Sequence, residues 1–131
     1  MEFQIDPTSR LPIYRQLGNQ IREAAARGKI QPGERLPSVR ELSRMLVVNP
    51  NTVARVYTEL EREGVLNTRA GMGVFAAPPG SELSRKVRKE RLQDAADRFL
   101  TEAVHLGFSA DEVVALIAAQ IKRFQWCDKE K

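Results

Sequence analysis

At 131 residues, of which 42% are hydrophobic, the chain is long enough to bury the core of one compact domain and to add a small second unit. Its formal net charge of +4 and its pI near 9.6 favour polyanionic partners, although so modest a charge does not establish nucleic-acid binding. One cysteine, Cys127, excludes an intrachain disulfide and a structural zinc site, and no apolar run approaches the ~18 residues of a membrane span. With no apolar export segment at its N-terminus, the sequence predicts a protein of the reducing cytoplasm.

The N-terminal region predicts a supporting helix. Pro12 precedes an amphipathic run that closes at Gly28, and we interpret Tyr14 as a packed residue whose hydroxyl reaches the surface. A turn is expected at residues 32–33 because proline and glycine occupy it. This turn leads residues 35–36 toward the next helix, as a short third strand beside a later hairpin.

A short helix is predicted to begin at Ser38. Its side chain can cap the free amides of the first turn, while Glu41, three residues on, reaches back to the Ser38 amide. Apolar residues recur at three- and four-residue spacing and predict one buried stripe, formed by Val39, Leu42, Met45 and Leu46. The other positions are expected to face outward, and they are Arg40, Glu41, Ser43 and Arg44.

A second helix follows after a joint of three residues, 47–49. Asn49 is the expected N-cap, and Pro50 suits the first helical position because no amide donor is needed there. The core-facing stripe of this helix consists of Val53, Val56, Tyr57 and Leu60. Gly64 ends the helix as a left-handed cap. The pair of helices is therefore predicted to form a helix-turn-helix.

The leading turn of the second helix carries residues suited to DNA. In a helix-turn-helix this turn enters the major groove, where the positive end of the helix dipole favours phosphates. Asn51 can pair with adenine and Arg55 with guanine, each through two hydrogen bonds, while Thr52 can contact a phosphate or a thymine methyl. The alternative for each residue alone is an ordinary solvated helix position. Together they favour DNA contact.

The residues after this helix predict a two-stranded wing. The runs at 65–69 and 74–76 alternate or cluster apolar residues, and they flank a glycine turn at 70–73, which is typical of a hairpin. The turn glycines let the backbone approach a phosphate or the minor groove closely, and Arg69 adds a positive charge at the base. Met72 is either an exposed turn residue without contacts or an apolar wedge, and the sequence leaves both open.

These stretches resemble the GntR family of bacterial transcription regulators, and more narrowly its short YtrA-like subfamily. The resemblance is carried by residues 12–17, 30–42, 48–53, 57–64 and 71–75. Beyond about residue 78 only length and helical character match. Two positions depart from the family pattern: Val47 replaces a glycine that is often present in the joint, and Met72 stands where a basic residue is common.

The resemblance implies which positions meet operator DNA. They are Arg40, the polar start of the second helix, Arg55 and the turn from Gly71 to Gly73. With Ser38 and Arg69 added, the predicted DNA-binding residues are Ser38, Arg40, Asn49, Asn51, Thr52, Arg55, Arg69, Gly71 and Gly73. In the wider family a larger C-terminal domain holds a metabolite, so the resemblance also raises a small-molecule effector.

A second unit is predicted beyond the proline-rich break at residues 77–80, which divides the chain into residues 1–79 and 80–131. Apolar residues at helical spacing predict one helix within residues 81–106, and a capping box from Ser109 to Glu112 begins another. Two helices alone bury their apolar stripes poorly, so a second copy of the chain is the expected partner. The alternative is that these helices pack back on the first domain.

Three features of this second unit have two interpretations each. The basic run at residues 85–91 is a solvated helix face or a contact with DNA flanks. His105 is a partly buried helix residue rather than a metal ligand or pH sensor, since no second histidine or cysteine pair completes a site. Cys127 has no sequence neighbour that persuasively lowers its pKa, so a reactive thiol is not favoured.

The predicted fold is mainly α with a small β-wing: a winged helix-turn-helix followed by a two-helix dimerisation unit. The leading hypothesis is a dimeric repressor that reads a pseudo-palindromic operator of double-stranded DNA. A winged-helix module that docks protein is the alternative, although such a face would carry larger apolar anchors. An enzyme is excluded because the sequence holds no paired nucleophile and base, metal cluster or phosphate loop, and no cofactor is expected. Any effector pocket is expected between subunits or units, near Phe99, Phe108, Phe124 and Trp126.

Overall fold

The computed structural model describes residues 3–78 and 85–126, and the chain divides into two compact units near residue 80. The predicted domain boundary at residues 79–80 and Cys127 both lie outside the described residues. The predicted fold class is confirmed, because the chain is mainly helical with a two-stranded antiparallel wing and two C-terminal helices.

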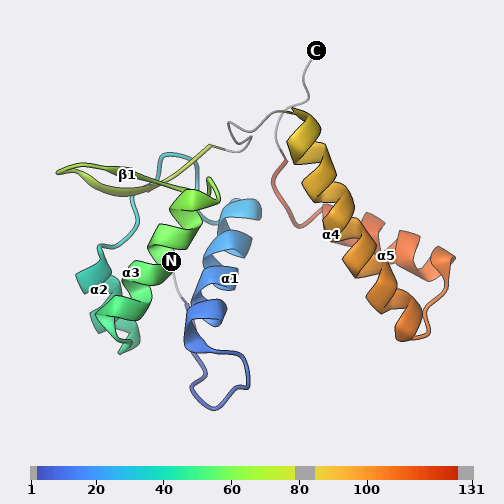
Figure 1. The fold of residues 1–131 in the computed structure, drawn as a ribbon, viewed down its shortest axis with the longest axis horizontal. Helices are drawn as coiled ribbons and strands as arrows, with labels where there is room; N and C mark the ends of the chain where they lie inside the picture. The colour runs from blue at the N-terminus through green and yellow to red at the C-terminus, as the bar shows by residue number, and fades with distance from the viewer. Residues whose placement is uncertain (1–2, 79–84, 127–131) are drawn as a thin grey trace. The chain divides into compact units, whose positions relative to one another are not determined.

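Three helices form the body of the first unit: α1 (Ile13–Ala26), α2 (Val39–Leu46) and α3 (Pro50–Arg62). Helix α3 packs against both α1 and α2, as Figure 1 shows. The stripes predicted from the sequence meet in one core, whose most deeply buried side chains are Leu17, Ile21, Leu42, Val53 and Leu60. The core therefore fixes the orientation of α3 in its own unit.

The helix starts agree with the sequence, whereas two positions in α2 do not. Ser38 and Glu41 form the predicted capping box, and Asn49 caps α3. Met45, expected in the buried stripe, is 59% exposed because α2 turns only one narrow side toward the core. Ser43, expected to face outward, is buried, and its hydroxyl donates to the Val48 carbonyl at 2.5 Å. That hydrogen bond satisfies the buried hydroxyl, so a polar residue is tolerated there.

The joint between α2 and α3 is strained at Val47. Its φ of 54° and ψ of 53° are left-handed, and among the described residues it is the non-glycine residue with positive φ. A β-branched side chain is disfavoured in this conformation, and Val47 gains no compensating burial because it is 90% exposed. Val47, which stands where the family often has glycine, therefore preserves the turn but strains its backbone.

Replacing Val47 with glycine is expected to stabilise the fold. Relief of about 1–2 kcal/mol of left-handed strain exceeds the ~0.5–1 kcal/mol entropy cost of a glycine, so unfolding free energy rises by up to about 1 kcal/mol. In a domain of this size that gain raises Tm by roughly 4–8 °C. Val47→Ala keeps a Cβ and is expected to gain less. A thermal denaturation in which Val47→Gly lowers Tm contradicts the strain at this joint.

The wing consists of β1 (Leu66–Arg69) and β2 (Gly73–Ala76), paired antiparallel with Leu66 opposite Ala76 and Arg69 opposite Gly73. The predicted third strand is present as a short extension: the Leu36 amide donates to the Val74 carbonyl at 2.8 Å, and Arg35 forms an isolated bridge with Phe75. The segment before α2 is thereby fixed to the wing.

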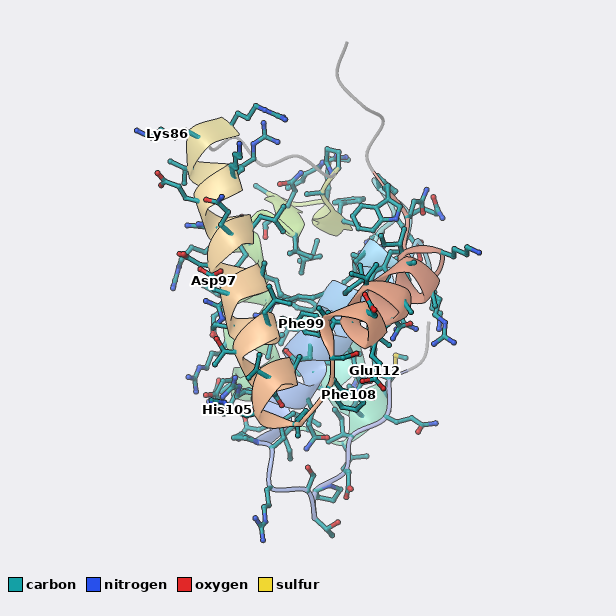
Figure 2. All side chains as sticks on the ribbon, turned by 90° about the vertical axis from the view of Figure 1, so that its right-hand side faces the viewer. Lys86, Asp97, Phe99, His105, Phe108 and Glu112 are labelled. Atoms are coloured by element: carbon teal, nitrogen blue, oxygen red, sulfur yellow. The ribbon has the colours of Figure 1, made fainter. Side chains whose placement is uncertain are left out.

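The second unit contains α4 (Arg85–His105) and α5 (Ala110–Ile121), the latter begun by the predicted Ser109 capping box. Among the residues described from 85 to 126, Ala103 is the only buried one. Figure 2 shows Asp97 and His105 on the side of α4 away from α5, with Phe99 toward it. The expectation that His105 is partly buried is wrong, because that side of α4 is exposed.

None of the described helices combines the length and apolar character needed to cross a membrane.

Candidate nucleic-acid interface

The leading turn of α3 presents its polar side chains to solvent. The Asn49 side-chain oxygen accepts a hydrogen bond from the Asn51 amide at 2.8 Å, which satisfies one of the free amides at the helix start. Asn51 is exposed and Thr52 is half-buried, so neither is consumed by the core. The Asn51 and Thr52 amides already donate to Asn49, so it is the positive end of the helix dipole that makes this turn attractive to anions.

Arg55, one turn further along α3, is supported by an aromatic ring. Its guanidinium carbon lies 3.9 Å from the centre of the Tyr14 ring, which belongs to α1 and packs against the core. Stacking occupies the flat face of the guanidinium and leaves its edge of N–H donors exposed. Tyr14 is thus more than the packed residue expected from sequence, since it also orients Arg55.

The first turn of α2 contributes Ser38 and Arg40. The Ser38 hydroxyl accepts from the Glu41 amide at 3.0 Å, and the Ser38 amide donates to the Glu41 carboxylate at 2.8 Å. This amide hydrogen bond is the main cause that lowers the pKa of Glu41. Arg40 is exposed beside the capping box. Helix α2 therefore brings one free guanidinium to the surface near its N-terminus.

Contacts between segments far apart in the chain hold the helices in position. The Tyr57 hydroxyl on α3 donates to the Pro37 carbonyl, just before α2, at 2.7 Å, and burial raises the pKa of this hydroxyl. On the other flank, Arg22 of α1 pairs with Glu63 through an N–O distance of 2.7 Å. The surface presented by α2 and α3 is therefore preorganised.

The wing places two glycines and one arginine at its turn. Gly71 and Gly73 have φ values of +75° and +124°, conformations that favour glycine. Arg69 lies over the Phe75 ring, with its guanidinium carbon 4.5 Å from the ring centre. Met72 is 61% exposed, which fits both an idle turn residue and an apolar wedge.

All nine predicted DNA-binding residues lie in the first unit, on α2, α3, their caps and the wing. None of them is buried: Ser38, Thr52 and Gly73 are half-buried, while Arg40, Asn49, Asn51, Arg55, Arg69 and Gly71 are exposed. The basic run at 85–91 lies in the second unit, where its residues are exposed on α4. Within the described part of the chain, no three His, Cys, Asp or Glu side chains are grouped to hold a metal.

Arg35 is a candidate that the sequence interpretation missed. A Cβ added at Gly73 would lie 2.9 Å from the Arg35 Nε, so this side chain runs closely across the wing. The only local signal was the expected third strand, which places Arg35 beside β2 but does not indicate a functional role.

Comparison with known proteins identifies relatives of this arrangement. The family model for bacterial regulatory proteins of the gntR family matches residues 13–76. The HTH-type transcriptional repressor YtrA of Bacillus subtilis is 34% identical over 123 residues, which cover 92% of this chain and 95% of that protein. A crystal structure described as a transcriptional antiterminator from Listeria monocytogenes EGD-e has a TM-score of 0.79 and 32% identity, covering 100% of this chain and 98% of its own.

A structure with bound DNA is also similar. The DNA-binding domain of AraR, in complex with operator ORX1, has a TM-score of 0.51 and 28% identity. The match covers 58% of this chain and 100% of that domain.

Proposed function

Because this chain belongs to the GntR family of bacterial regulatory proteins, we propose that it represses transcription by binding a pseudo-palindromic operator as a homodimer. The resemblance to the family and to its YtrA-like members is confirmed, and the chain is a DNA-binding transcriptional regulator rather than an enzyme. Repression is supported by the name of its Bacillus relative, a transcriptional repressor.

The exposed leading turn of α3 is the observation that carries the proposal. Asn51 and Arg55 lie outward on α3 while Val53 and Leu60 anchor its opposite side in the core. We assign adenine contact to Asn51, guanine contact to the free edge of Arg55, and phosphate contact to Thr52. These assignments place base recognition on α3.

The remaining predicted residues are proposed to hold the DNA backbone. Arg40 supplies a charge near the α2 N-terminus, while Ser38 and Asn49 lie where the positive ends of the α2 and α3 dipoles face the strand. On the wing, the backbone at Gly71 and Gly73 approaches the minor groove. Phosphate contacts of this kind set the register of α3 in the major groove.

A homodimer through the C-terminal helices is supported by their exposed apolar surface. The exposed large apolar residues of this unit include Leu92, Phe99, Leu100, Val104, Phe108, Val114, Leu116, Ile117 and Ile121. A patch of this extent marks an interaction site, and a second copy buries equivalent stripes by two-fold symmetry. Two copies present two α3 helices to major grooves about one helical turn, or ~34 Å, apart. We place this regulator in the cytoplasm, where its DNA target lies.

The residue boundary between the DNA-binding and dimerisation units is proposed at 79–80, consistent with the two compact units of the chain. A small-molecule effector stays an open prediction for the second unit, near its exposed Phe99 and Phe108. A thermal-shift screen in which diverse ligands leave Tm unchanged counts against such an effector.

An electrophoretic shift with genomic fragments, repeated as salt is raised, tests the function. The full chain is expected to shift a subset of fragments, with log affinity falling linearly against log salt because bound phosphates release counterions. The alternative is a module that docks protein through the same face. Absent or salt-insensitive DNA binding supports that module and contradicts the regulator.

A further inference from the structure

Two arginines, Arg35 and Arg69, lie on the outward face of the wing next to Gly73, which has no side chain. Because paired residues on antiparallel strands share a face, Arg69 and Gly73 lie on the same side of the hairpin as Phe75 and Arg35. The opposite face turns inward, since Leu66 and its partner residue Ala76 are buried. Arg35 and Arg69 therefore both reach solvent on one face of the wing.

Close contacts hold both guanidinium groups at this face. Arg69 stacks on the Phe75 ring at 4.5 Å, and Arg35 crosses Gly73 so closely that a Cβ there would lie 2.9 Å from its Nε. The Arg35 backbone is fixed by its bridge to Phe75. Both cations are thus positioned before any ligand binds, which reduces the ordering cost of binding.

The charge on this face is not neutralised by an ion pair. Neither Arg35 nor Arg69 forms a salt bridge within the described part of the chain. Arg35 contributes to the lowered pKa of the Glu41 carboxyl group, but the hydrogen bonds with Ser38 are the larger causes, and Glu41 Oε1 already accepts from the Ser38 amide. Two guanidinium groups without a carboxylate partner suit an anion with several acceptor oxygens.

We propose that Arg35 and Arg69 form a clamp for one backbone phosphate of the bound DNA, and that Gly73 leaves the space that Arg35 needs. The clamp rests on the proposed function and adds Arg35 to the DNA-binding residues. Guanidinium forks match phosphate oxygens in geometry, and contacts to phosphate carry no base preference. The clamp therefore contributes affinity and register and does not discriminate between sequences.

Arg35→Gln tests the clamp, with Lys29→Gln as its matched control. Lys29 is exposed after α1, in a hollow lined by Phe3 and Glu23 and not by α2, α3 or the wing. Affinity is measured at several salt concentrations for a selected operator and for a random duplex. Arg35→Gln is expected to weaken both duplexes by the same several-fold factor and to reduce the salt slope by about 0.9, the value for one phosphate. Lys29→Gln is expected to leave the slope unchanged.

Gly73→Ala gives a second, independent readout. It is expected to weaken DNA binding in the wild-type background, because its Cβ displaces Arg35 and strains a residue whose φ is +124°, and to weaken it less in the Arg35→Gln background, where only the backbone strain remains. Thermal denaturation of each variant separates lost binding from lost fold.

The outcomes distinguish failure of the clamp from failure of the proposed DNA-binding function. A wild-type chain that binds no duplex overturns the regulator and the clamp together. If the wild-type chain shows a steep salt slope and Arg35→Gln shows the same slope, the clamp alone is overturned. A loss confined to the operator also overturns it, because that loss indicates base recognition by Arg35.

Discussion

Replacing Ile117 with aspartate is expected to convert the protein from a dimer to a monomer and to lower operator affinity by about 10²–10⁴-fold. Ile117 is 40% exposed on α5 and lies in one stripe with Val114 and Ile121, spaced three and four residues away. A carboxylate in this stripe is buried without a partner when two copies meet, which is strongly unfavourable. The loss in affinity follows because each monomer engages a single half-site.

Ala115→Asp is the matched control for this variant. It adds the same charge to the same helix, but two residues from Ile117 the side chain projects on nearly the opposite face. Sedimentation measures the oligomeric state and an electrophoretic shift measures operator affinity. We expect Ala115→Asp to stay dimeric with wild-type affinity. An Ile117→Asp chain that remains dimeric contradicts the proposed interface on α5.

Local sequence signals were sufficient to predict the elements of the first unit. Ser38 with Glu41, and Asn49 with Pro50, marked both helix starts because capping depends on residues that are adjacent in the chain. The glycines around Met72 predicted the hairpin turn for the same reason. The fold class could therefore be predicted from short-range chemistry.

Burial of individual residues was harder to predict, because it depends on how widely each helix contacts its neighbours. Periodicity placed Met45 in the buried stripe of α2, yet α2 contacts its neighbours along a stripe too narrow to cover this side chain. Ser43 is buried because the Val48 carbonyl lies close enough to accept its hydroxyl. His105 is exposed because no described residue of its own unit covers that side of α4.

The supporting contacts of the site could not be predicted from sequence. Arg55 stacks on Tyr14 of another helix, and Arg35 crosses Gly73 of the wing, so each pair joins segments far apart in the chain. The residue types at the start of α3 indicated DNA contact. Which ring orients Arg55, and what occupies the space at Gly73, depends on tertiary packing.

The leading turn of α3 is proposed to read operator bases, and a comparison of Arg55→Ala with Arg62→Ala tests this role. Both arginines are exposed on α3, seven residues apart and so on the same side of the helix, which separates them by two turns, or roughly 10 Å. They differ mainly in their distance from the leading turn. Each variant removes one arginine charge from the same side of α3, either close to the leading turn or two turns away from it.

Operator affinity of the two variants is measured by titration on a duplex selected from random DNA, with a scrambled duplex as reference. We expect Arg55→Ala to weaken operator binding by about 1–3 kcal/mol, roughly 5- to 150-fold, and to leave the dimer intact. Arg62→Ala is expected to change operator affinity little. Unchanged operator affinity in Arg55→Ala, or a larger loss in Arg62→Ala, contradicts base recognition by the start of α3.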